Sequence, residues 1–118
     1  MKGKGFFFRL RYSFNGFLFA IAHESSFRTQ LLAAFFALGS LLILHPPLVW
    51  AALVVVMVVL VLAAELINTA IEQVLDGLHP EFANFVRFAK DCSAAAVLIL
   101  SLAAVVVYAM MLCAIFKI

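Results

Sequence analysis

The residues from Leu48 to Asp76, LVWAALVVVMVVLVLAAELINTAIEQVLD, decide the fold of this chain. They begin as an uncharged and almost wholly apolar run that ends at Ala64. An apolar run of this length predicts a helix that crosses a membrane. The segment that follows carries two Glu, an Asn and an Asp, and these polar side chains need an explanation of their own.

The composition places the chain among membrane proteins. It has 118 residues, of which 68% are hydrophobic and 12% are charged, and this is far from the balance of a soluble globular domain. Its five glycines form neither a phosphate loop nor a dinucleotide fingerprint. We therefore expect one integral-membrane domain over residues 1–118 and exclude a soluble nucleotide-binding fold.

Three segments are long enough to span a bilayer, at about residues 27–47, 48–75 and 92–116. The first is the weakest, because its uncharged part is short and needs Arg28 to extend toward the interface. The residues His45-Pro46-Pro47 predict a tight turn, since paired prolines cannot continue a helix. The sequence predicts an all-α membrane protein with three transmembrane helices and an additional N-terminal amphipathic surface helix.

That surface helix is expected at about residues 6–25, which are rich in Phe and carry Arg9 and Arg11. An aromatic and basic segment suits a helix that lies in the membrane interface, with its arginines toward anionic headgroups. The alternative is a cleaved signal peptide whose charged region would be Lys2 and Lys4. The two arginines argue against it, because they interrupt what should be a continuous apolar core.

The basic residues predict the orientation of the spans. Five of them precede the first span, two lie between the second and third, and Lys117 alone follows the last. By the positive-inside rule the N-terminus and the loop at about residues 77–90 are cytoplasmic, and the C-terminus is outside. All the acidic residues then lie at or near the cytoplasmic side.

The polar side chains at the end of the second span form one stripe. At about 100° per residue, Asn68, Glu72 and Asp76 fall within an arc of roughly 80° that includes Glu65. Asp76 is explained equally well as a solvated residue where the helix leaves the membrane. Glu65 and Asn68 are not, because their other neighbours are apolar and a carboxylate near hydrocarbon is costly unless it is paired, hydrated or bound to a cation. Mutual repulsion predicts a raised carboxyl pKa or a divalent cation among these groups.

Two further segments are expected at the same membrane face: AHESSFR at 22–28 and AKD at 89–91. Each has a purely structural alternative, because Asp91 could cap the third helix and Glu24 could pair with Arg28. If they join the stripe, carboxylates, a lysine and an amide converge at the inner interface. This set suits Mg²⁺-assisted phosphoryl transfer, and it would also serve a proton or cation pathway.

The combination of ELINTAIEQVLD and AKDCSAAAV, with YSFNGFLFAIAHESSFR upstream, resembles the small bacterial integral-membrane diacylglycerol kinases and their undecaprenol kinase relatives. The resemblance extends over about residues 12–97. It implies a homotrimer in the bacterial inner membrane with active sites shared between subunits, whose partners are a membrane lipid and ATP with Mg²⁺, and no nucleic acid.

The resemblance also implies a role for each polar residue. Glu65 would be the general base for the lipid hydroxyl, and Asn68 would orient groups around it. Glu24 and Glu72 would hold the metal. The residues on the nucleotide side would be Lys90, Asp91, Asp76, Glu81 and Ser13.

The lipid is the least certain part of this interpretation. Four residues depart from the pattern common in the proteobacterial enzymes: Gln30, Gly77 and the pair Ser93-Ala94. ESSFR favours diacylglycerol, and undecaprenol is the alternative within the same family. A different class, a small ion-binding or scaffolding subunit, is disfavoured because its polar groups should be spread through the depth of the bilayer.

Overall fold

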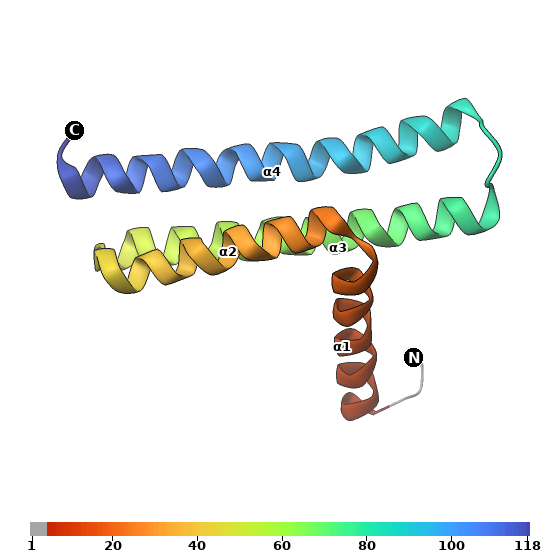
Figure 1. Ribbon diagram of the computed structural model, residues 1–118, viewed down its shortest axis with the longest axis horizontal. Helices are drawn as coiled ribbons and strands as arrows, with labels where there is room; N and C mark the ends of the chain where they lie inside the picture. Colours follow the sequence, from red (N-terminus) through yellow and green to blue (C-terminus); the bar gives the residue numbers. More distant parts are fainter. Residues whose placement is uncertain (1–4) are drawn as a thin grey trace.

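The computed structural model describes residues 5–118 and contains four helices in that range: α1 (Phe6–His23), α2 (Ser25–Leu44), α3 (Leu48–Leu78) and α4 (Asn84–Phe116). Helices α2, α3 and α4 run side by side, and α1 runs across their direction from the N-terminal end of α2 (Figure 1). Lys2 and Lys4, which contribute to the expected orientation, lie outside the described residues.

The three long helices are the expected membrane spans. All three are long and apolar enough to cross a bilayer, with mean hydropathies over an 18-residue stretch of 1.7 in α2, 2.8 in α3 and 2.7 in α4. The lower value for α2 confirms that the first span is the weakest. Most large apolar side chains on these helices point outward, and among the large side chains only Phe27 and Met111 are completely buried. Outward apolar surface of this extent suits lipid contact or assembly with other copies.

The turn between α2 and α3 forms where the prolines predict it. His45 caps α2 in the left-handed conformation, with φ 47° and ψ 56°, and its N–H donates to the Leu41 carbonyl at 3.1 Å. Pro47 precedes the first residue of α3, where it needs no helical N–H partner. The chain therefore reverses within three residues, and α2 and α3 pack as an antiparallel pair.

The corner between α1 and α2 is held by Arg28 and by two aromatic rings. Glu24 is the one non-helical residue between the helices, with φ −118° and ψ 109°. The Arg28 guanidinium donates to the carbonyls of Ile21 at 2.7 Å and Ala22 at 3.3 Å, which are among the last carbonyls of α1. Phe17 packs edge to face on the buried Phe27, with ring centroids 5.3 Å apart.

The lengths of the helices differ in a way that positions the site. Helix α2 has 20 residues and α3 has 31, so α3 is longer by about 16 Å at 1.5 Å per residue. In Figure 1 the additional length of α3 and α4 extends beyond the corner where α1 leaves. Helix α4 begins at Asn84, before the third span was expected to start near Cys92, so the helix is longer than its apolar run.

Candidate active site

The stripe on α3 runs from a buried end to an exposed end. Glu65 and Asn68 are 3% and 7% exposed, whereas the Asp76 side chain is 60% exposed. Along the stripe, Glu65 contacts α2, while Asn68 and Asp76 contact α4. The stripe therefore lies between both neighbouring helices and crosses from the protein interior to solvent.

Glu65 is held by α2 but keeps one carboxylate oxygen unoccupied. Its Oε2 accepts a hydrogen bond from Ser26 Oγ at 3.2 Å. The Thr69 hydroxyl donates to the Glu65 carbonyl at 2.9 Å, which adds to the polar contacts on this turn. Within residues 5–118 Oε1 accepts no hydrogen bond and is not completely enclosed. A carboxylate fixed at one oxygen and open at the other is suited to accept a proton from a hydroxyl.

Asn68 is fixed by two side chains at once. Its Nδ2 donates to Glu72 Oε1 at 3.0 Å, and Ser93 Oγ donates to its Oδ1 at 2.6 Å. The Glu72 carboxylate can only accept a hydrogen bond, so the NH₂ group of the amide faces Glu72 and its oxygen faces the Ser93 hydroxyl. The amide thereby links the stripe to α4 and positions the Glu72 carboxylate.

Glu24 at the α1–α2 corner is electrostatically coupled to the stripe. Burial raises the pKa of its carboxyl above the ordinary value, and the negative charges of Glu72 and Glu65 raise it further. His23 and Arg28 oppose this rise to a smaller extent. The sequence predicted repulsion among the carboxylates of the stripe, and here the stripe also repels the carboxylate at the corner. Carboxylates that repel one another at close range are stabilised by a cation.

The possible Glu24–Arg28 ion pair is absent, because the guanidinium is engaged by the α1 carbonyls. Within residues 5–118 no group of three or more His, Cys, Asp or Glu side chains is arranged to hold a metal alone. Two carboxylates fit Mg²⁺ that takes its remaining ligands from substrate phosphates and water. Glu24 and Glu72 thus fit a metal that is bound together with a nucleotide.

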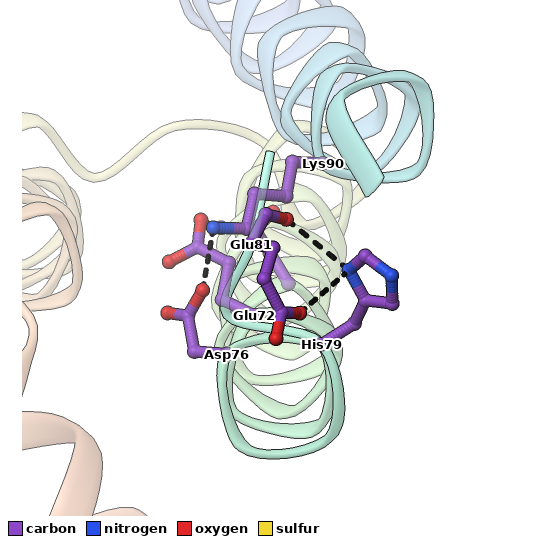
Figure 2. Close-up of polar contacts among 6 residues, drawn as sticks. Glu72, Asp76, His79, Glu81 and Lys90 are labelled. Carbon is purple, nitrogen blue, oxygen red and sulfur yellow. Dashed lines mark hydrogen bonds and ion pairs between the residues drawn. The ribbon is translucent and has the colours of Figure 1, made fainter. Parts of the chain in front are cut away.

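At the exposed end, Lys90 of α4 reaches across to Asp76 of α3 (Figure 2). The ammonium donates to Asp76 Oδ1 at 2.6 Å, and it is also within electrostatic reach of Glu72. In the following loop His79 Nδ1 lies 3.5 Å from Glu81 Oε2, and the His79 ring packs on Phe85. A lysine between two carboxylates is positioned for a phosphate that approaches from the solvent side.

Two residues with expected nucleotide roles lie apart from this cluster. Asp91 is exposed on α4, on a different side from Lys90, and makes no hydrogen bond or ion pair within the described part of the chain. The expectation that it could cap the third helix is wrong, because the residue before α4 is Ala83. Ser13 lies on α1, where its hydroxyl donates to the Arg9 carbonyl at 2.9 Å. A single chain does not bring either side chain to the stripe.

Two hydroxyl residues in the site were missed by sequence reasoning. Ser26 was read as part of the segment around Glu24, and Ser93 as part of a pair that departs from the family pattern. Ser26 lies two residues after Glu24, and Ser93 three residues after Lys90, so proximity to predicted site residues was the available signal. The Ser26 hydroxyl binds the buried Glu65, and the Ser93 hydroxyl binds the buried Asn68.

Comparison with known proteins gives the family of this chain. Residues 11–112 match the model of a family described as prokaryotic diacylglycerol kinase. A diacylglycerol kinase of Escherichia coli K12 is 33% identical over 101 residues, which cover 86% of this chain and 83% of the relative. A diacylglycerol kinase of Synechocystis is 33% identical over 98 residues, and there the chain spans 56% of the length of the relative.

Proposed function

Because this chain belongs to the prokaryotic diacylglycerol kinase family, we propose that it transfers the γ-phosphoryl group of ATP to the primary hydroxyl of diacylglycerol, giving phosphatidic acid and ADP. The observation that carries the proposal is Glu65: a buried carboxylate, fixed by Ser26 at one oxygen and open at the other. Through Ser26 it contacts the first turn of α2, next to the corner where the surface helix α1 meets the spans.

The reaction requires one proton acceptor at the membrane boundary. The lipid hydroxyl oxygen forms a bond to the γ-phosphorus while the bond between that phosphorus and the β,γ-bridging oxygen breaks. The hydroxyl proton moves to Glu65 Oε1 and is then released to solvent, and ADP leaves with the bridging oxygen. Asn68 orients the reacting groups through its fixed amide.

Glu24 and Glu72 would hold Mg²⁺ on the phosphates of ATP. When bound, the metal supplies neutralisation of the charge on the phosphate oxygens. Lys90 would contribute a second positive charge after it exchanges Asp76 for a phosphate oxygen. Asp76 and Glu81 lie farther out, on the side expected for the adenosine.

We propose further that three copies assemble in the inner membrane with the N-terminus in the cytoplasm, and that their active sites are shared. This arrangement would give Ser13 and Asp91 a neighbouring site to act in, since neither reaches the stripe of its own chain. The outward apolar faces of the spans support assembly of this kind.

The experiment is a phosphoryl-transfer assay with purified protein in mixed micelles and radiolabelled ATP. Diacylglycerol and undecaprenol are offered separately, and folding is checked by circular dichroism. Label in phosphatidic acid is the expected result. Label in undecaprenyl phosphate alone would contradict the proposed lipid but keep the kinase. Folded protein that labels neither lipid would contradict the kinase assignment.

A further inference from the structure

A groove lies between α2 and α4 on the membrane side of the candidate active site. Both helices pack on α3, but no Cα atom of α2 comes within 8 Å of one in α4. The space between them has a volume of about 590 Å³. Its lining is almost entirely apolar and includes Ala34, Ala37, Met57, Val61, Ala104 and Leu112.

Two hydrogen bonds span the gap between α2 and α4. Gln30 Nε2 donates to Ser101 Oγ at 3.0 Å, and the hydroxyls of Ser40 and Tyr108 lie 2.6 Å apart. Only the first pair lines the groove with both of its members. Polar side chains within a membrane span are rare, and their presence needs a structural or functional reason.

The Gln30–Ser101 pair lies at the end of the groove nearest the proposed base. Gln30 is one helical turn beyond Ser26, whose hydroxyl binds Glu65. Val61, which lines the groove, is one helical turn before Glu65 on α3. At 1.5 Å per residue, the pair therefore lies about 6 Å deeper in the membrane than the carboxylate. A lipid whose hydroxyl reaches Glu65 would place the next part of its structure at this level.

Gln30 and Ser101 can each form further hydrogen bonds in addition to the one between them. Gln30 has a second amide N–H and a carbonyl oxygen, and the Ser101 hydroxyl donates to no group within residues 5–118. Diacylglycerol has its ester carbonyls a few bonds from the primary hydroxyl, and these are acceptors without donors. A polyprenol has only hydrocarbon at that depth, against which the spare donors would stay unpaired at a cost in free energy.

We propose that Gln30 and Ser101 bind an ester carbonyl of the lipid substrate and so select diacylglycerol over an isoprenoid alcohol, with the adjoining groove taking the first part of an acyl chain. This inference rests on the proposed lipid kinase activity and assigns it a specificity determinant. Because the pair recognises the ester rather than the hydroxyl, it affects which lipid is used and not the transfer of the phosphoryl group itself.

The test compares two lipids that differ only at the ester: dioctanoylglycerol and its dioctyl diether analogue. Both present the same primary hydroxyl and chains of the same length. We expect the full-length protein to use the diester with a kcat/KM about fivefold higher, the contribution of one hydrogen bond. Gln30→Met, which keeps the length of the side chain without its amide, and Ser101→Ala should each use the two lipids equally.

The matched control is Ser40→Ala. It also deletes one serine hydroxyl from a hydrogen bond between α2 and α4, but Ser40 does not line the groove. Its preference for the diester should match that of the unmodified protein. The ratio is measured within each variant, so a partly misfolded fraction does not alter it.

Equal use of the diester and the diether by the unmodified protein would overturn the inference while leaving the kinase intact. A diester preference that persists in both Gln30→Met and Ser101→Ala would overturn it as well. Folded protein that phosphorylates neither lipid would overturn the kinase assignment first and the inference with it.

Discussion

The two ends of the stripe on α3 hold their polar groups by different physical means. At the inner end, Glu65 and Asn68 are buried and are held by hydrogen bonds to Ser26 at 3.2 Å and Ser93 at 2.6 Å. At the outer end, Lys90 and Asp76 form an ion pair that is partly open to solvent. Buried polar groups are costly to leave unpaired, whereas an exposed ion pair is screened and contributes little. The inner end is therefore built for fixed geometry and the outer end for exchange of partners.

The largest effect should come from Glu65→Gln, which keeps the shape of the inner end but removes its basicity. We expect kcat to fall by about 10²–10⁴-fold, the range for loss of a general base, with little change in the KM for ATP. Steady-state kinetics with diacylglycerol check this. Activity equal to that of the unmodified protein would show that another group accepts the proton.

The next effect should be on stability, from Asn68→Ala. The change removes the hydrogen bonds of Asn68 to Glu72 and to Ser93, and although the Ser93 hydroxyl keeps the Lys90 carbonyl, the free energy of unfolding should fall by about 1–3 kcal/mol. Thermal or denaturant unfolding in detergent measures it. Ser93→Ala removes only one of the two contacts and serves as the milder comparison. Stability unchanged in both variants would mean that the inner end is not fixed by these bonds.

The Mg²⁺ requirement of the reaction, measured as a function of pH, tests the role of Glu24 at the corner between α1 and α2. The pKa of Glu24 is raised in the folded protein, so its carboxyl binds a proton at a pH where an ordinary glutamate is ionised. Mg²⁺ must displace that proton. The Mg²⁺ concentration for half-maximal rate should therefore rise as the pH falls through the raised pKa, by up to about tenfold per pH unit below it.

In the protein without metal, the raised pKa of Glu24 makes the folded state more stable at low pH than at high pH. Because the folded-state pKa of Glu24 lies above its unfolded value, its contribution to stability is fully present below the unfolded pKa and is lost as the pH rises through the folded pKa. Added Mg²⁺ should reverse this loss. Unfolding curves measured with and without Mg²⁺ check the sign, and a metal effect that does not vary with pH would contradict the role of Glu24.

The smallest effect should come from Asp76→Asn at the outer end. The ion pair with Lys90 is exposed, so the free energy of unfolding should change much less than in Asn68→Ala, and the difference should shrink in high salt. Because the lysine is released from its carboxylate, the KM for ATP should fall slightly or stay the same. A loss of stability as large as that of Asn68→Ala would remove the distinction between the two ends.

The periodicity of α3 was enough to predict the stripe, because one helix places residues three and four apart on the same face. The number of spans, the turn at His45 and the convergence of Glu24 with the stripe also followed from apolar length and topology. The partners of Glu65 and Asn68 did not. Ser26 and Ser93 depend on how α2 and α4 are rotated against α3, and a sequence pattern contains no information on that rotation.

The start of α4 was also beyond sequence reasoning. The end of an apolar run marks where a span leaves the membrane, but the helix itself continues back to Asn84. For this reason Lys90 projects from the second turn of a regular helix toward α3 rather than from a loop. The same extension removes Asp91 from the position of a helix cap.

The unequal lengths of α2 and α3 have a consequence for how two substrates of opposite solubility can meet. The Glu65 carboxylate lies beside the first turn of α2, and α3 and α4 continue beyond that level. In the proposed orientation these further turns stand in the aqueous phase. An alcohol that is insoluble in water can stay in its leaflet, and a highly charged nucleotide can stay in the cytosol. Neither compound has to be extracted into the other phase, so the desolvation that would otherwise oppose the encounter is confined to one hydroxyl and one phosphate.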